Sequence, residues 1–227
     1  MSVQGPAVPE LSRRPDFGRS QSLSISRQGG PFEMMGLPVT YSRNEEIYGE
    51  GEPAEYLYKV KSGCVRIYRV LNDGRRQISA FYLPGDIFGL EAGEEHSASA
   101  EASVASELMI VKRSALDSRA SGDSRFARRL FDLTVKELHR TQDHALLLIK
   151  TAKERVAAFL IDLAKRASND GEIDIPMSRQ EIADYLGLTI ETVSRTLTQL
   201  ENSAAITLPS SRRIILRDRG ALLRMNS

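Results

Sequence analysis

The sequence predicts an α+β protein in which an antiparallel jelly-roll β-barrel is followed by a long helix and a C-terminal winged helix-turn-helix. Short strands separated by sharp turns occupy the first half of the chain. No Gly or Pro then interrupts the stretch between Gly122 and Gly171, and two short helical patterns joined by a glycine turn follow it. These patterns divide the chain into an arm (1–31), a barrel (32–117), a long helix (118–151) and a winged-helix domain (152–227).

The composition is that of a globular protein with a buried core. Hydrophobic residues make up 41% and charged residues 27% of the 227 positions. No run approaches the ~18 apolar residues of a membrane span, and the N-terminus lacks the apolar region of a secretory signal, so we predict a cytoplasmic protein without membrane contact. The single cysteine, Cys64, excludes an internal disulfide and cannot alone hold an iron–sulfur cluster or a zinc finger.

Charge is unevenly distributed although the net charge is only +1. Residues 32–117 carry 9 basic and 14 acidic side chains, whereas the chain from 118 onward is net basic. A polyanion is therefore expected to approach the C-terminal half.

Residues 1–31 are predicted to form a disordered arm, because 14 of these 31 positions are Ser, Gly or Pro and no periodicity emerges. The alternative is a tail that contacts DNA or a partner protein through its four arginines, Arg13, Arg14, Arg19 and Arg27.

The barrel strands are predicted from two-residue alternation and from turn residues. Tyr56, Tyr58 and Val60 alternate with Leu57 and Lys59, and the turn Asn72-Asp73-Gly74 is typical of a hairpin. The expected strands cover residues 56–61, 65–68, 77–83, 98–104 and 108–111.

The long helix carries a heptad pattern of apolar side chains with one polar member. Spacings of four and three residues relate the positions of this seam: Phe131, Val135, Leu138, Gln142, Ala145 and Ile149. The seam either packs on the barrel of its own chain or pairs two chains in a homodimer. A second apolar set on the neighbouring face (Phe126, Leu130, Leu133) can cover the barrel, which favours the homodimer. The next helix, 152–167, is predicted to be core.

Residues 177–200 have the pattern of a helix-turn-helix. Ser178 and Glu181 form an S-x-x-E capping box, Gly187 allows a turn with positive φ, and Thr189 can cap the second helix. The buried side of the second helix is predicted to carry Val193, Leu197 and Leu200, and its polar side Glu191, Ser194, Arg195 and Thr198.

The polar side suits the reading of bases in double-stranded DNA. Arg195 can donate two hydrogen bonds to guanine, Glu191 can accept from cytosine, and Ser194 can bind a base edge or a phosphate. The alternative is a solvent-exposed helix with an ordinary i,i+4 ion pair between Glu191 and Arg195. A hairpin over 206–216 is predicted to be the wing, in a basic segment that also contains Arg217 and Arg219. Contacts to the DNA backbone are predicted for Ser178, Arg179, Thr189, Thr192, Thr198, Arg212 and Arg213.

The sequence resembles the Crp/Fnr family of transcription regulators from about residue 32 to 220. The segment IADYLGLTIETVSRTLTQLE (182–201) resembles their helix-turn-helix, and EGEPAEYLYKVKSGCVRIYRV (50–70) with PGDIFGLE (84–91) resembles their cyclic-nucleotide-binding-type barrel. The arrangement of Glu191, Ser194 and Arg195 is similar to the Fnr and FixK branch, whose operators are TTGA…TCAA palindromes. The resemblance implies a homodimeric activator, with helix 118–151 as the dimerisation helix and RNA polymerase as a partner.

The same resemblance implies that the barrel has lost its nucleotide site. Family members that bind cyclic AMP use a Glu for the ribose and an Arg for the phosphate. Here Glu91 is displaced by one position, His96 stands where the Arg would be, and Asp86, Glu94 and Glu95 add negative charge. Fnr-type sensing requires an N-terminal cysteine cluster, which 1–31 lack. The FixK-like branch remains, whose members activate genes of microaerobic respiration and nitrogen fixation without a bound cofactor, so no cofactor is expected.

Three other hypotheses stay open. Haem ligation is conceivable through Cys64, His96, His139 or His144, although the barrel position of Cys64 is more typical of a buried residue. A small effector or a redox signal can gate a regulator of this kind. A cyclic-nucleotide module of an enzyme complex is the third, and the winged helix argues against it. No enzyme motif such as G-x-S-x-G, H-E-x-x-H or GxxxxGK[ST] occurs, so catalysis is not expected.

Overall fold

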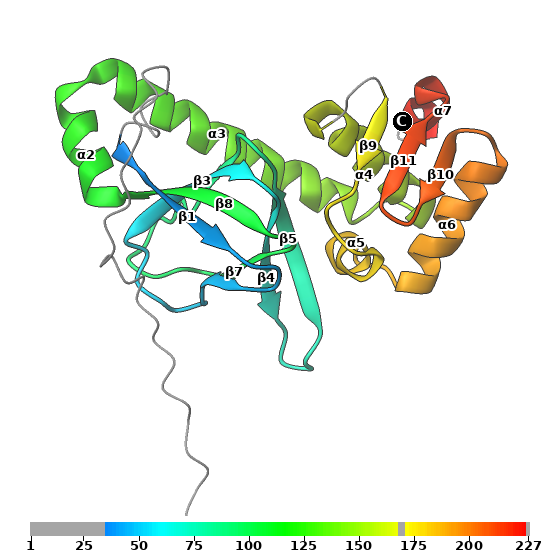
Figure 1. The fold of residues 1–227 in the computed structure, drawn as a ribbon, viewed down its shortest axis with the longest axis horizontal. Coiled ribbons are helices and arrows are strands. Elements are labelled where there is room, and N and C mark those ends of the chain that lie inside the picture. Colours follow the sequence, from blue (N-terminus) through cyan, green and yellow to red (C-terminus); the bar gives the residue numbers. More distant parts are fainter. Residues whose placement is uncertain (1–34, 168–170, 226–227) are drawn as a thin grey trace, which may run out of the picture.

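The computed structural model describes residues 35–167 and 171–225 of the chain. The predicted arm at 1–31 lies outside the described residues. The described part has the predicted α+β architecture, with a β-barrel, a long helix along it, and a winged helix-turn-helix beside the barrel at the C-terminal end of that helix (Figure 1).

The barrel consists of two four-stranded antiparallel sheets. One sheet has the order β1-β8-β3-β6 and the other β2-β7-β4-β5. Every predicted strand is present, and β1, β2 and β6 are additional. The strands are β1 (Leu37–Tyr41), β2 (Glu46–Tyr48), β3 (Tyr56–Ser62), β4 (Val65–Val70), β5 (Arg76–Tyr82), β6 (Ile87–Phe88), β7 (Ser99–Ala102) and β8 (Ser106–Lys112).

Aromatic side chains fill the barrel interior. The rings of Tyr58 and Phe88 stack with centroids 5.0 Å apart, and Tyr48 and Tyr82 pack against Phe88. The hairpin from β4 to β5 turns at Asn72-Asp73-Gly74, where Gly74 has a φ of 81° that L-residues rarely adopt. The prediction of this hairpin is confirmed.

The helix predicted over 118–151 is two helices rather than one. They are α2 (Arg113–Gly122) and α3 (Ser124–Leu147), and they are separated by Asp123, whose φ of −135° is extended. The Asp123 carboxylate accepts hydrogen bonds from the backbone N–H groups of Arg125 and Phe126, so it caps α3. Asp123 therefore separates the two helices, a break that the sequence did not predict.

The two apolar faces of α3 have different surroundings. Phe126 is buried against the barrel, and Leu130 and Leu133 pack beside it, as predicted. On the seam, Phe131 is 61% and Leu138 55% exposed. The alternative in which the seam packs on its own barrel is therefore wrong. Ile149, the last seam residue, follows the end of α3 and is also exposed.

The C-terminal domain combines four helices with a three-stranded sheet of order β10-β11-β9. Helix 152–167 is confirmed, whereas β9 and α7 were not predicted because each is only a few residues long. The elements are α4 (Ala152–Ala167), β9 (Glu172–Asp174), α5 (Arg179–Leu186), α6 (Ile190–Asn202), β10 (Ile206–Ser210), β11 (Arg213–Leu216) and α7 (Arg219–Met225).

A shared hydrophobic core joins this domain to the barrel. Ile78, Phe81 and Leu83 of the barrel belong to the same buried cluster as Val156 and Ile182 of the C-terminal domain. The β5 strand contacts α5, and Figure 1 shows α5 on the side of the domain that faces the barrel. Within the described part, no helix has the length and apolarity needed to cross a bilayer.

Candidate DNA-binding surface

Helix α5 begins with the predicted capping box. The Ser178 hydroxyl accepts from the Glu181 backbone N–H at 3.2 Å, and the Glu181 carboxylate accepts from the Ser178 backbone N–H at 2.6 Å. Such a cap stabilises a helix by about 1 kcal/mol. Ile182 and Leu186 of α5 are buried, so this side of the helix packs on the core.

The turn after α5 depends on a glycine. Gly187 adopts φ 61° and ψ 41°, the left-handed conformation that glycine tolerates best. Arg155 of α4 donates to the carbonyl oxygens of Leu186 at 2.8 Å and Gly187 at 3.3 Å. The angle between α5 and α6 is thus held by a turn conformation and by a side chain from a third helix.

Helix α6 presents the predicted polar stripe to solvent. Thr189 caps the helix by accepting from the Thr192 backbone N–H at 3.2 Å. Among the described residues, Glu191 and Arg195 form no ion pair with each other or with a third residue, so the alternative of an ordinary i,i+4 pair finds no support here. The buried side is Val193, Leu197 and Leu200, whereas Glu191, Arg195 and Thr198 are exposed and Ser194 is half-buried.

Four of the five side chains predicted to contact the DNA backbone on these helices lie at the two helix N-termini, whereas Thr198 lies in the third turn of α6 and donates to the Ser194 carbonyl oxygen at 3.1 Å. Ser178 is engaged in the capping box of α5, and Arg179 beside it is half-buried. The hydroxyls of Thr189 and Thr192 lie 3.0 Å apart at the start of α6. Helix N-termini carry free N–H groups and a partial positive charge, which suits contact with phosphates.

The wing places its two predicted arginines in different environments. Arg212 is exposed in the turn between β10 and β11. Arg213 donates through Nε to Asp174 at 3.1 Å and forms an ion pair with Glu172 at 3.0 Å, and both carboxylates belong to β9. Contact of Arg213 with phosphate stays a prediction, and we expect it to be weaker than that of Arg212, because Arg213 is already ion-paired within the sheet.

This difference predicts unequal salt effects. Arg212→Ala is expected to weaken binding to all DNA sequences alike and to lower the slope of log affinity against log salt by about 0.9 for each phosphate that the protein no longer neutralises. Arg213→Ala is expected to change the slope less, because an arginine already paired with Glu172 and Asp174 neutralises less phosphate charge. Fluorescence anisotropy at four salt concentrations measures both slopes; a larger slope change for Arg213→Ala would contradict this assignment.

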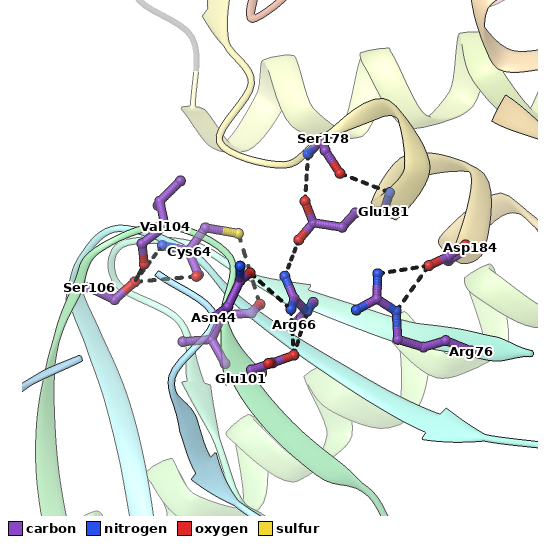
Figure 2. A network of polar contacts seen from close by, with 11 residues as sticks. Asn44, Cys64, Arg66, Arg76, Glu101, Val104, Ser106, Ser178, Glu181 and Asp184 are labelled. Carbon is purple, nitrogen blue, oxygen red and sulfur yellow. Dashed lines mark hydrogen bonds and ion pairs between the residues drawn. The ribbon is translucent and has the colours of Figure 1, made fainter. Parts of the chain in front are cut away.

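Ion pairs between the barrel and α5 were not predicted from the sequence. Arg66 of β4 has a side chain only 5% exposed and donates to Glu181 at 2.5 Å, and Arg76 of β5 donates to Asp184 at 3.0 Å (Figure 2). Burial opposes ionisation of Glu181, but the hydrogen bonds from Ser178 and Arg66 outweigh it and hold its pKa below the ordinary value. Arg66 and Glu181 are 115 positions apart, so no local signal connects them.

Two further polar contacts join α3 to the C-terminal domain. Asp86, in the turn before β6, accepts from Arg140 of α3 at 3.2 Å and from Arg166 of α4 at 2.5 Å. His144, near the end of α3, lies with Nε2 2.9 Å from the carbonyl oxygen of Tyr185, and the two rings stack. Helix α3 is therefore connected to α4 through Asp86 and to α5 through His144.

The barrel contains a pocket of about 330 Å³. Its lining includes Glu91, whose carboxylate accepts from the Ser97 backbone and hydroxyl, and Glu137. Arg69 is the cation among the described lining residues, and it is paired with the Ser97 carbonyl oxygen and with Glu50. These residues do not fit a cyclic phosphate, because the guanidinium is already engaged and two carboxylates face the same space.

The four candidate haem ligands are scattered. His96 is buried and stacked on Tyr48 at 3.5 Å, and burial lowers its pKa although Glu91 nearby favours the charged form. Cys64 is fully buried, and burial raises the pKa of its thiol to about 12. His139 is exposed on α3 and His144 binds Tyr185. The described residues contain no cluster of three or more His, Cys, Asp or Glu side chains that could hold a metal ion.

Comparison with known proteins identifies both folded regions. Residues 38–121 match the cyclic nucleotide-binding domain family, and residues 154–225 match the family of Crp-like helix-turn-helix domains. The two matches lie in the order that the resemblance implied.

Relatives that align over most of the chain identify its branch of the Crp/Fnr family. The chain is 55% identical over 199 residues to the nitrogen fixation regulation protein FixK of Azorhizobium caulinodans, covering 85% of this chain and 80% of that protein. It is 44% identical to FixK of Rhizobium meliloti, covering 86% and 90%. The structure of FixK2 from Bradyrhizobium japonicum superposes with a TM-score of 0.83 at 48% identity, covering 85% and 98%. The chain therefore belongs to the FixK-like branch of the Crp/Fnr family of DNA-binding transcription regulators, and it is a regulator rather than an enzyme.

Proposed function

We propose that this protein is a homodimeric transcription activator that binds a TTGA…TCAA palindrome without cyclic AMP or an iron–sulfur cluster. The observation that carries the proposal is the free polar stripe on α6, where Glu191 and Arg195 are exposed and have no ionic partner in the described chain. Side chains of this kind, four residues apart at the start of a recognition helix, suit the edges of guanine and cytosine.

Dimerisation is inferred from the α3 seam. Exposed apolar side chains at heptad spacing are costly in water and are stabilised when a second helix covers them. A two-fold dimer through α3 would present two α6 helices to half-sites one helical turn of DNA apart, which is how a palindrome is read. The protein would then recruit RNA polymerase as a second partner at the promoter.

The genes controlled are inferred from the relatives. Three proteins named nitrogen fixation regulation protein FixK are 40–55% identical to this chain. We infer control of nitrogen-fixation genes or of genes for microaerobic or anaerobic growth.

Ligand independence is supported by the barrel pocket. Arg69 is paired with Glu50 and the Ser97 carbonyl, and Glu91 and Glu137 line the same space, so a cyclic phosphate would meet negative charge without a free guanidinium. The pocket volume of about 330 Å³ also keeps open the second candidate, a regulator gated by a small effector of different charge.

Cyclic AMP is expected to change neither the melting temperature nor the affinity for DNA. A ligand present at 100 times its Kd would raise the free energy of unfolding by about 2.7 kcal/mol, which a thermal melt detects easily. Protein freed of metal is melted with cyclic AMP at up to about 5 mM, which is roughly 100-fold above a Kd of tens of micromolar. Anisotropy is recorded on a TTGA…TCAA duplex and on a scrambled duplex, and adenosine 5′-monophosphate is the control nucleotide.

The two readouts separate the parts of the proposal. Preference for the TTGA…TCAA duplex over the scrambled one supports sequence-specific binding. A saturable rise in melting temperature with cyclic AMP, absent with adenosine 5′-monophosphate, would show that the barrel still binds the nucleotide.

A further inference from the structure

Helix α5 is attached to the barrel through a buried cluster of charged side chains. Arg66 donates to Glu101 of β7, to Asn44 in the turn before β2, and to Glu181 of α5 (Figure 2). The side chains of Arg66 and Glu181 are 5% and 4% exposed. One guanidinium thus has three acceptors, two from the barrel and one from the helix-turn-helix.

Such a cluster is an expensive way to attach two domains. Removing charges from water costs free energy, and apolar side chains of similar volume often stabilise an interface as well or better. Unlike an apolar contact, the interaction of a buried arginine is directional, because its planar donors require acceptors at fixed positions. The cluster therefore restricts the orientation of α5 in a way that the surrounding hydrophobic core does not.

Two features make the restriction rigid. Glu181 uses one carboxylate oxygen for Arg66 and the other for the Ser178 backbone N–H, so the contact acts on the first turn of α5 itself. Asp184, one turn later on the same face, is bound by Arg76 of β5. With two attachment points one turn apart, α5 resists both rotation about its axis and displacement along the barrel.

We propose that Arg66 is a positioning residue for DNA binding, which fixes the helix-turn-helix relative to the barrel and thereby sets the distance between the two α6 helices of the dimer. The inference rests on the proposed function, because it assumes that two half-sites are read together. Arg66 lies on the barrel, and the barrel packs against α3, which carries the dimer seam. Helix α6 follows α5 after a single turn. An error in the orientation of α5 is therefore passed on to α6 and to the half-site spacing.

The variants are Arg66→Met, Arg66→Lys and Glu181→Gln. Glutamine is the milder test, because it is also a capping-box residue but offers one acceptor oxygen where the native contacts use two. It can serve either Ser178 or Arg66, and it folds even if Arg66→Met does not. The matched control is Lys61→Met, which breaks the more exposed ion pair of Lys61 with Glu107 on the same barrel.

Domain orientation is measured first, without DNA. Spin labels are attached to cysteines introduced at Lys112 of the barrel and Gln199 of α6, both exposed, while the native Cys64 is buried. When doubly labelled protein is mixed with a large excess of unlabelled protein, so that only distances within one protomer are measured, wild type and Lys61→Met are expected to give one narrow distance distribution. Arg66→Met and Glu181→Gln are expected to give a broad one, with Arg66→Lys between them. Unchanged distributions in both of the first two variants would overturn the proposal.

Half-site spacing is measured second. A series of palindromes whose half-sites are moved apart or together by single base pairs is titrated with each variant, beside a duplex with one half-site. Loss of positioning is expected to lower affinity for the preferred spacing by roughly tenfold or more and to flatten the preference, with half-site affinity unchanged. A lower melting temperature with the wild-type spacing preference would show a purely structural role and would overturn the proposal. If wild type itself has no preference for the palindrome, the proposed function fails, whereas the distance measurement still tests the positioning role.

Discussion

Replacing Leu138 with lysine is expected to convert the protein into a monomer and to lower its affinity for the palindrome by at least about a hundredfold. Leu138 is central in the seam and 55% exposed in the single chain. In a two-fold interface each residue near the axis meets its own copy or a close neighbour of it, so the substitution introduces two like charges into an apolar contact. Neither lysine would have an acidic partner among the seam residues, which are apolar apart from Gln142.

Light scattering with size-exclusion chromatography measures the assembly, and anisotropy on the palindrome and on a half-site measures binding. Asp143→Lys is the control, since Asp143 is exposed on α3 but lies off the seam and the charge change is larger. We expect the control to remain dimeric and the Leu138→Lys variant to bind the palindrome no better than a half-site. A dimeric Leu138→Lys protein would place the interface elsewhere.

The second large effect is expected on base readout. Glu191→Ala and Arg195→Ala should each lower affinity for the palindrome by about 1–3 kcal/mol, because each removes hydrogen bonds to one base pair in each half-site. Both side chains are exposed in the first two turns of α6, and the capping residue Thr189 holds the helix that carries them. Discrimination at that base pair should relax in the same variants.

The measurement is a titration of each variant against the palindrome and against duplexes with one symmetric base pair changed. Asp143→Ala serves as the control, because Asp143 is exposed on α3, away from the recognition helix. Its affinities should follow those of the wild type. If Glu191→Ala and Arg195→Ala weakened binding equally on every duplex, the two residues would be structural or phosphate contacts rather than readers of bases.

The parts of the fold that the sequence predicted are those with local causes. Alternation over two residues revealed β3 and β4, and the Ser178–Glu181 capping box marked the start of α5 to the residue. The heptad seam was visible because it repeats within a single helix. In each case the residues that determine the feature lie within a few positions of one another.

The parts that it missed depend on partners far away in the chain. Arg66 looks like a polar residue on a strand, and only the fold brings it to Glu181 and Glu101. The phosphate contact of Arg213 stays a prediction, but no local pattern indicated that pairing of β11 with β9 places two carboxylates beside it. The break at Asp123 was missed for a different reason, since an aspartate in a helical pattern can be either a surface residue or a cap.

We propose that two copies of this chain read one palindrome through a two-fold axis. The most direct test compares the TTGA…TCAA palindrome with a duplex of the same length in which the second half-site is inverted to give a direct repeat. The half-sites, their spacing and the base composition are then identical, and only the symmetry differs. A two-fold dimer should bind the palindrome at least about tenfold more tightly than the direct repeat, because only one α6 helix can engage the latter fully. Equal affinity for the two duplexes would contradict binding as a symmetric dimer.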